Sequence, residues 1–227
     1  WYSSICTKEH DLDMDEEISI IDTNTRNEKI KNFFINNKKI LILYTSVIIF
    51  GLCGYFSFEE IKERNQIKLA NKFNLVTINY KENSQQITIN ELIDIVNQNN
   101  TTYSPLALYF LLDNNLIKDN NKINELFDQL IDETKLEQEI KNLIIYKKAL
   151  FNSSFVTEND LLKILNPIIN SESIWKSHSL YLLAEYFYSN NEDQKAKEFF
   201  KEILTLSNSN NGIKLESQKR LKRDFGE

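Results

Sequence analysis

One apolar stretch dominates the pattern of hydrophobic and polar positions along the chain. Residues 40–58 carry no charged side chain, and two lysines precede them while two glutamates follow. A helix of this length rises about 28 Å, which is close to the thickness of the hydrocarbon core of a bilayer. We therefore predict a single transmembrane helix over 40–58.

Two other kinds of apolar segment fit this stretch less well. A core helix of a soluble protein normally has a shorter apolar segment and a polar stripe, and 40–58 has neither. A cleaved signal peptide has a short apolar region near the N-terminus and a small-residue cleavage site. The stretch is too long and too far into the chain for that, and it ends in Ser57-Phe58-Glu59-Glu60. We expect an anchor that stays attached.

The charges around the span predict its orientation. Residues 27–39 form a short amphipathic pattern rich in lysine, which predicts a juxtamembrane helix lying at the interface. Cytoplasmic flanks of membrane helices carry an excess of Lys and Arg, so we expect the N-terminus in the cytoplasm. The residues before them, 1–26, are acidic and have almost no apolar pattern, which predicts a disordered cytoplasmic head. Because Met14 is the first methionine, we interpret 1–13 as a miscalled start or a fragment end.

Beyond the span the pattern is that of an all-α protein, because amphipathic segments alternate with polar turns and the whole chain holds only four glycines and two prolines. Residues 59–86 are predicted to extend the membrane helix and then form a linker, and 87–227 to form a helical domain. Asn90, Asn121 and Asn159 are the predicted N-caps. The predicted helices of the domain are 88–98, 103–117, 122–132, 134–151, 158–169, 173–189, 192–206 and 213–224.

Similar segments recur in this domain at a nearly constant spacing. Steps of 34, 35 and 35 residues separate the equivalent positions Leu92, Leu126, Leu161 and Ala196. This period is typical of helix-pair solenoids, particularly of tetratricopeptide repeats. The last unit fits that consensus best, because small residues allow its two helices to approach closely and aromatic residues fill the space beside them. The predicted packing positions of this unit are Leu180, Leu183, Ala184, Phe187, Ala196, Phe200 and Ile203.

This architecture resembles the ancillary subunit family of the SecYEG translocon, which consists of single-span inner-membrane proteins with a tetratricopeptide-like periplasmic domain. The resemblance covers about residues 27–224, and it rests on NEKIKNFFINNKK before the span, FSFEEIKERNQIKLANKFN after it and TTYSPLALYFLLDNNLI further on. It implies a C-terminal domain in the periplasm, with the translocon and periplasmic chaperones as partners. The chain departs from the family in having larger Leu, Ile and Tyr residues where Ala- and Gly-rich helices are usual, so the resemblance does not define a partner surface.

Composition argues against several other kinds of site. A net charge of −6 without a block of basic residues argues against a general nucleic-acid binder. Two histidines give a zinc site or a catalytic triad almost nothing to use, and no glycine-rich phosphate-binding motif occurs. We therefore predict no catalytic, metal or cofactor-binding residues. Cys6 and Cys53 are too few for a disulfide framework.

Two sets of residues are candidates for interaction. Gly51 and Gly54 leave a notch in the span that another membrane helix could enter, and simple exposure to lipid is the alternative. Tyrosines on the helices of the domain could line a binding groove, although they would serve equally well in a core. These groove candidates are Tyr109, Tyr146, Tyr181 and Tyr188.

The expected function is that of a non-enzymatic scaffold, anchored in the inner membrane, that links the Sec translocon to periplasmic chaperones or emerging polypeptides. A helical-repeat factor for assembly or cell division in the envelope is the first alternative. An anchored enzyme is the second, and it would require a polar pocket with converging titratable groups.

Overall fold

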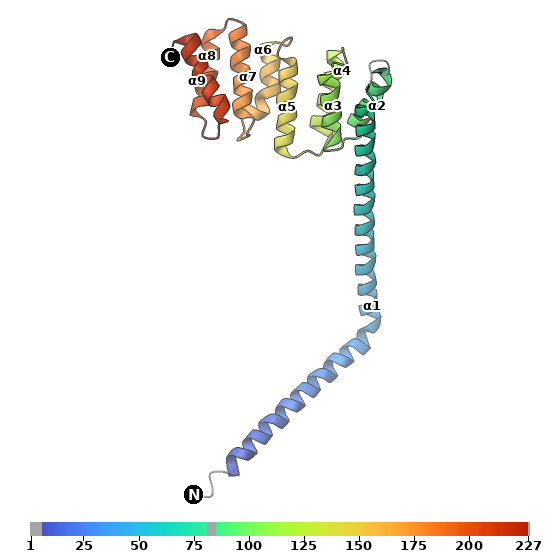
Figure 1. The fold of residues 1–227 in the computed structure, drawn as a ribbon. Helices are drawn as coiled ribbons and strands as arrows, with labels where there is room; N and C mark the ends of the chain where they lie inside the picture. Colours follow the sequence, from blue (N-terminus) through green and yellow to red (C-terminus); the bar gives the residue numbers. More distant parts are fainter. Residues whose placement is uncertain (1–5, 81–84, 227) are drawn as a thin grey trace. The chain divides into compact units, whose positions relative to one another are not determined.

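The computed structural model describes residues 6–80 and 85–226, with side chains from residue 25 onward. The described residues contain helices and no strands (Figure 1). Contacts divide the chain into two units, 1–66 and 67–227, which are described separately. The helices are α1 (Cys6–Ile78), α2 (Gln85–Asn97), α3 (Tyr103–Asp113), α4 (Asn120–Glu133), α5 (Gln138–Asn152), α6 (Glu158–Ile169), α7 (Lys176–Ser189), α8 (Asp193–Thr205) and α9 (Asn211–Phe225).

The described part of the first unit is residues 6–66 of α1, which continues as one helix to Ile78. The predicted juxtamembrane helix, the predicted span and the predicted extension all belong to it. Side chains of the span have no protein cover, and Phe50, for example, is 78% exposed. Among the described residues, α1 is the one helix that is long and apolar enough to cross a membrane. The prediction of an all-α chain with a single candidate span is confirmed.

The structure differs from the prediction in the head of the chain. The acidic residues 9–22, which the composition predicts to be disordered, lie within α1, whereas residues 1–5 lie outside the described part. Low hydrophobicity argues against a packed core, but a single exposed helix needs no core, since its backbone hydrogen bonds are internal. The composition of the segment therefore does not exclude a helix.

In the second unit, α2–α9 correspond one to one with the eight predicted helices. The largest differences are four residues each: α5 begins at Gln138 instead of residue 134, and α3 ends at Asp113 instead of residue 117. Asn115, with a φ of 52°, is in the left-handed region that ends helices, so 114–119 form a loop. Two N-caps also lie two residues before the predicted ones. The side chain of Asp119 accepts a hydrogen bond from the backbone of Asn121, and Thr157 caps α6 in the same way.

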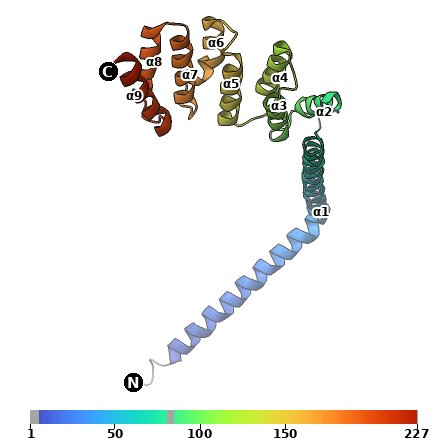
Figure 2. The ribbon, with the colours of Figure 1, turned by 45° about the horizontal axis from the view of Figure 1, so that its top comes forward.

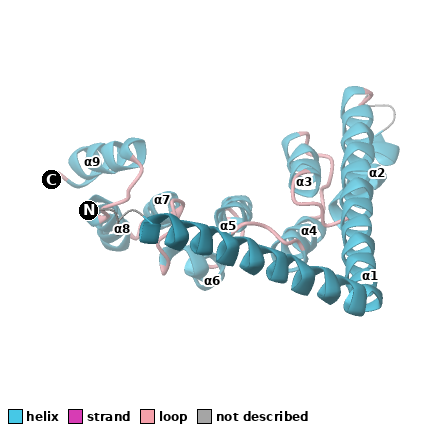
Figure 3. Cartoon of the chain, turned by 90° about the horizontal axis from the view of Figure 1, so that it is seen from below, coloured by secondary structure: helices cyan, strands magenta, loops and turns pink. Residues whose placement is uncertain are grey.

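The helices of the second unit form two layers. Figure 3 shows α3, α5, α7 and α9 in one layer, called the odd layer here, with α4, α6 and α8 in the other. Consecutive helices stand side by side along the unit (Figure 1, Figure 2). The equivalent positions of the repeat all lie on even-numbered helices and are at most 1% exposed; they are Leu92, Leu126, Leu161 and Ala196. The period of the sequence therefore marks alternate helices of a solenoid.

The last turns of α1 belong to the repeat unit. Leu69 and Val76 are each 6% exposed and lie in the same apolar cluster as residues of α2, α3 and α4. The Lys72 ammonium lies 2.7 Å from the carboxylate of Asp94 on α2. The ring of Phe73 packs on that of Tyr103, with the centroids 5.9 Å apart. The compact unit therefore begins at Ile67 rather than at the predicted boundary of 87.

The hairpin of α7 and α8 is packed as its sequence predicts. All seven packing positions named above are at most 1% exposed, and all belong to one apolar cluster. Ala184 and Ala196 are fully buried, one on each helix. Phe187 and Phe199 stack with their centroids 5.5 Å apart, beside these small residues. The alanines allow close approach of the helices, and the rings fill the remaining volume.

We expect Ala184→Leu to lower the free energy of unfolding by about 2 kcal/mol, because extra methylene groups at a fully buried position force the two helices apart. Glu198→Leu on the exposed side of α8 is the control, with an expected change within about 0.5 kcal/mol. Urea unfolding of the full chain in detergent micelles, followed by tryptophan fluorescence, measures both. Equal changes in the two variants would contradict the packing described.

Candidate functional site

All four candidate tyrosines lie on the odd layer. Tyr109 is on α3, Tyr146 is on α5, and Tyr181 and Tyr188 are on α7. Each is half-buried, so each ring has one face in the core and another part toward solvent. Their half burial agrees with a place in the core, and a binding groove over them stays a prediction.

Three of these tyrosines contact the next helix of the odd layer. The Lys147 ammonium on α5 lies 4.4 Å from the centroid of the Tyr109 ring. Tyr146 stacks on Trp175, directly before α7, with 5.9 Å between the ring centroids. The guanidinium of Arg220 on α9 lies 4.4 Å from the centroid of Tyr188. Such cation–π and aromatic pairs each stabilise by roughly 0.5–1.5 kcal/mol, so the tyrosines tie successive helices together.

Burial raises the pKa of three of these phenols. It raises the pKa of Tyr109 to about 12 and also raises the pKa of Tyr146. Burial, with the nearby Glu185 carboxylate, raises the pKa of Tyr181 to about 12. These three hydroxyl groups, which are uncharged at neutral pH, thus stay uncharged to a higher pH than an exposed tyrosine, and they can both donate and accept hydrogen bonds.

An ion cluster closes the C-terminal end of the odd layer. The Arg220 side chain is 11% exposed, and its Nε lies 3.0 Å from Oε1 of Glu185 on α7. Its Nη1 lies 3.0 Å from Oδ2 of Asp224, one turn further along α9. Hydrogen bonds from Arg223, with the charge of Arg220, lower the pKa of the Asp224 carboxyl. The cluster fastens α9 to α7.

The remaining candidates stand as follows. His178 packs beside Tyr146 and Trp175, and burial lowers the pKa of its imidazole. In the part of the chain that was searched for metal sites, no group of three or more His, Cys, Asp or Glu side chains could hold a metal ion. Gly51 and Gly54 lie on the open surface of α1, and a Cβ added at either would meet no atom within 4 Å. Docking of another helix there stays a prediction.

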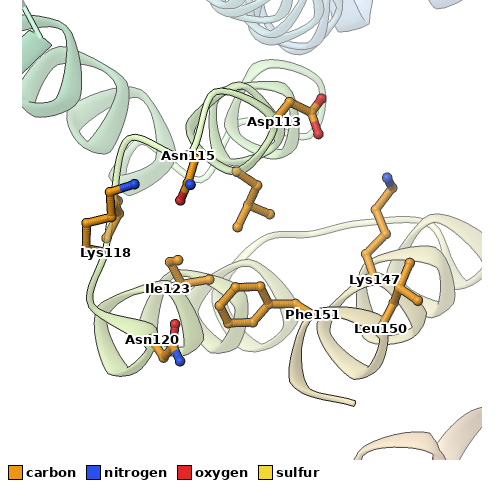
Figure 4. Close-up of a pocket in the computed structure, with 10 residues that line it drawn as sticks. Asp113, Asn115, Lys118, Asn120, Ile123, Lys147, Leu150 and Phe151 are labelled. Atoms are coloured by element: carbon orange, nitrogen blue, oxygen red, sulfur yellow. The ribbon is translucent and has the colours of Figure 1, made fainter. Parts of the chain in front are cut away.

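Sequence reasoning missed a cavity at the other end of the odd layer (Figure 4). It has a volume of about 300 Å³ and lies between the C-terminal ends of α3 and α5, the loop 114–119 and the start of α4. The length of the loop 114–119 was the one feature of the sequence that could have indicated this cavity, because a long connection can hold two helices apart and leave room between them. The lining residues are Leu112, Asp113, Asn115, Ile117, Lys118, Asn120, Ile123, Lys147, Leu150 and Phe151.

The fold and these surfaces define a class of protein: an all-α helical solenoid preceded by one helix that is long and apolar enough to cross a membrane. No family model matches the chain, and no significant match was found to a curated protein or to a solved structure.

Arg220→Ala should lower the free energy of unfolding by about 2 kcal/mol, since it leaves the partly buried Glu185 carboxylate without its partner and removes the cation from the Tyr188 ring. Arg223→Ala is the matched control, because it also removes a guanidinium from Asp224 but one that is 63% exposed. The control should change stability much less than Arg220→Ala does, because solvent screens an exposed ion pair. Urea unfolding and hydrogen exchange of α9 measure the difference, and equal exchange in both variants would refute it.

Proposed function

We propose that this protein is a membrane-tethered scaffold whose repeat unit binds protein partners. The observation that carries the proposal is that α1 combines two features. It contains a segment that is apolar enough to cross a membrane, and its last turns pack in the repeat unit. The proposed tether and the first part of the repeat unit therefore belong to the same helix, α1. Helical solenoids characteristically use the extended surface of their stacked hairpins for binding other proteins.

The length of the connection supports a role at the membrane surface. Eight residues, 59–66, separate the predicted span from the start of the repeat unit. Even fully extended, eight residues reach at most about 29 Å. The repeat unit therefore stays close to the bilayer, and a partner held at the same membrane meets it at a high effective concentration, so weak intrinsic binding suffices.

The resemblance described above makes the proposal more specific. On that basis the span lies in the inner membrane, the N-terminus is cytoplasmic and the repeat unit is periplasmic. The partners would be the Sec translocon and periplasmic chaperones, or polypeptides leaving the translocon. The lysines before the span and the glutamates after it support this orientation.

Cysteine labelling tests the orientation. In a chain carrying Cys6→Ser and Cys53→Ala, Ser154→Cys should react with a membrane-impermeant maleimide added to cells whose outer membrane is permeabilised. Asn27→Cys should react only after the inner membrane is opened. Both positions are exposed, so accessibility of the side chain is not limiting. The reverse labelling pattern would contradict the proposed topology.

Photo-crosslinking in native membranes tests the partner within the same proposal. A photoreactive phenylalanine analogue in place of Tyr146, on the odd layer, should capture a translocon subunit or a periplasmic chaperone. The same analogue in place of Gln194, exposed on α8, is the matched control for the other layer. Capture of division or envelope-assembly proteins instead would favour the alternative function, and capture of no protein would refute the scaffold.

A further inference from the structure

We propose that the cavity between α3, α4 and α5 is a docking site for a short acidic segment of a partner protein, which inserts one apolar side chain between two lysines. This inference rests on the proposed scaffold function and names the chemistry of a partner. The cavity combines an apolar floor, two cations without carboxylate partners and two free amides, and each feature is considered in turn.

The floor of the cavity is apolar and fixed in place. Ile123 at its base is only 4% exposed. The ring of Phe151 packs against Phe127, with 6.2 Å between centroids, and edge-on against Phe155 at 5.3 Å. At the rim, Leu150 is 50% exposed and would lose that exposure to an inserted side chain. A volume of about 300 Å³ is at the lower end of the range for ligand pockets, which suits one or two side chains rather than a large cofactor.

Two lysines line this floor without a counter-ion. Neither Lys118 nor Lys147 has a carboxylate partner among the described residues, although both line the cavity. Their neighbours differ, since Lys122 is paired with Glu125 and Lys148 is paired with Asp128 on α4. Lys118 is therefore available, and Lys147, whose ammonium lies over the Tyr109 ring, has no carboxylate that neutralises its charge.

The other charged and polar groups leave the balance positive. Asp113 is the one carboxylate in the lining, and it is paired with neither lysine. Asp119 in the adjacent loop is already engaged, because it accepts a hydrogen bond from the backbone of Asn121. The side chains of Asn115 and Asn120 line the cavity (Figure 4), and neither makes a hydrogen bond to another residue in the part of the chain that the structure describes. They can pair with the main chain of an extended peptide, while the lysines pair with its carboxylates.

A fluorescein-labelled pentapeptide, with a central phenylalanine and two glutamates on each side, is the probe. Fluorescence anisotropy measures its binding to the full chain in lipid nanodiscs. Lys118→Gln with Lys147→Gln should weaken binding by about fivefold, as expected for two partly exposed ion pairs. Lys135→Gln with Lys222→Gln makes the same charge change at exposed positions outside the lining, and should alter binding by less than about twofold.

Two further variants test the floor and the sign of the charge. Leu150→Gln should weaken binding by about fivefold, because the rim loses apolar area. Asp113→Asn should strengthen binding by about twofold, since it removes the one like charge in the lining. Both positions are exposed, and unchanged far-ultraviolet circular dichroism confirms that each variant is folded.

Several results would overturn the assignment. Equal binding of a peptide with glutamines in place of the glutamates would show that the lysines are not used. Equal binding of a peptide with alanine in place of the central phenylalanine would show that the apolar floor of the cavity is not used. Binding of octanoate without binding of the peptide would identify a site for small apolar anions. If the chain does not bind the peptide but still forms crosslinks from position 146, the docking site in the cavity is overturned and the scaffold function is not. If neither binding nor crosslinks are found, both proposals are overturned.

Discussion

Burial of apolar side chains between neighbouring helices holds the repeat unit together, because a single amphipathic hairpin cannot cover its own apolar face. α5 shows how this works along the unit. Its adjacent residues Ile144 and Ile145 belong to two different apolar clusters, one on each side of the helix. Every internal helix thus depends on both neighbours, and the two terminal helices need another solution.

At the N-terminal end that solution is α1. Leu69 and Val76 supply the apolar cover that a preceding hairpin would give, and the Lys72–Asp94 pair fixes the helix against α2. At the other end α9 exposes mostly polar side chains, with Leu215 as the exception, and inserts Leu221 into the second cluster. The helix that is long and apolar enough to cross a membrane is therefore also the cap of the solenoid, and a chain cut within 67–78 would lose both that apolar segment and part of its core.

Much of this fold was accessible from the sequence. The period of 34 or 35 residues identified the even-numbered helices, since Leu92, Leu126, Leu161 and Ala196 are all buried there. The start of the repeat unit could not be predicted from the sequence. The apolar spacing of Leu69 and Val76 predicts a buried face of the helix, but it does not indicate which helices bury that face. The N-caps were misplaced for a related reason. Asp119 and Thr157 stand two residues before other good capping residues, and the choice depends on the fold.

The candidate surfaces divide in the same way. The sequence could supply the four tyrosines, because aromatic residues at helical spacing are visible in it. The cavity was not visible, since its lining comes from three helices and a loop that only the packing brings together. The unpaired state of Lys118 and Lys147 is likewise a property of the fold, because carboxylates are plentiful in the neighbouring sequence.

Lys147 connects the two surfaces. Its ammonium is held over the Tyr109 ring, and it also lines the cavity. A free lysine side chain loses up to about 2 kcal/mol of rotamer entropy when a ligand fixes it, and this loss often cancels the gain from an exposed ion pair. The contact with the Tyr109 ring restricts the Lys147 side chain before any ligand binds. Such a cation–π contact stabilises by about 0.5–1 kcal/mol, which is too little to compete strongly with a carboxylate. Tyr109 thus acts as a support that makes Lys147 a better anion-binding group than an unsupported surface lysine.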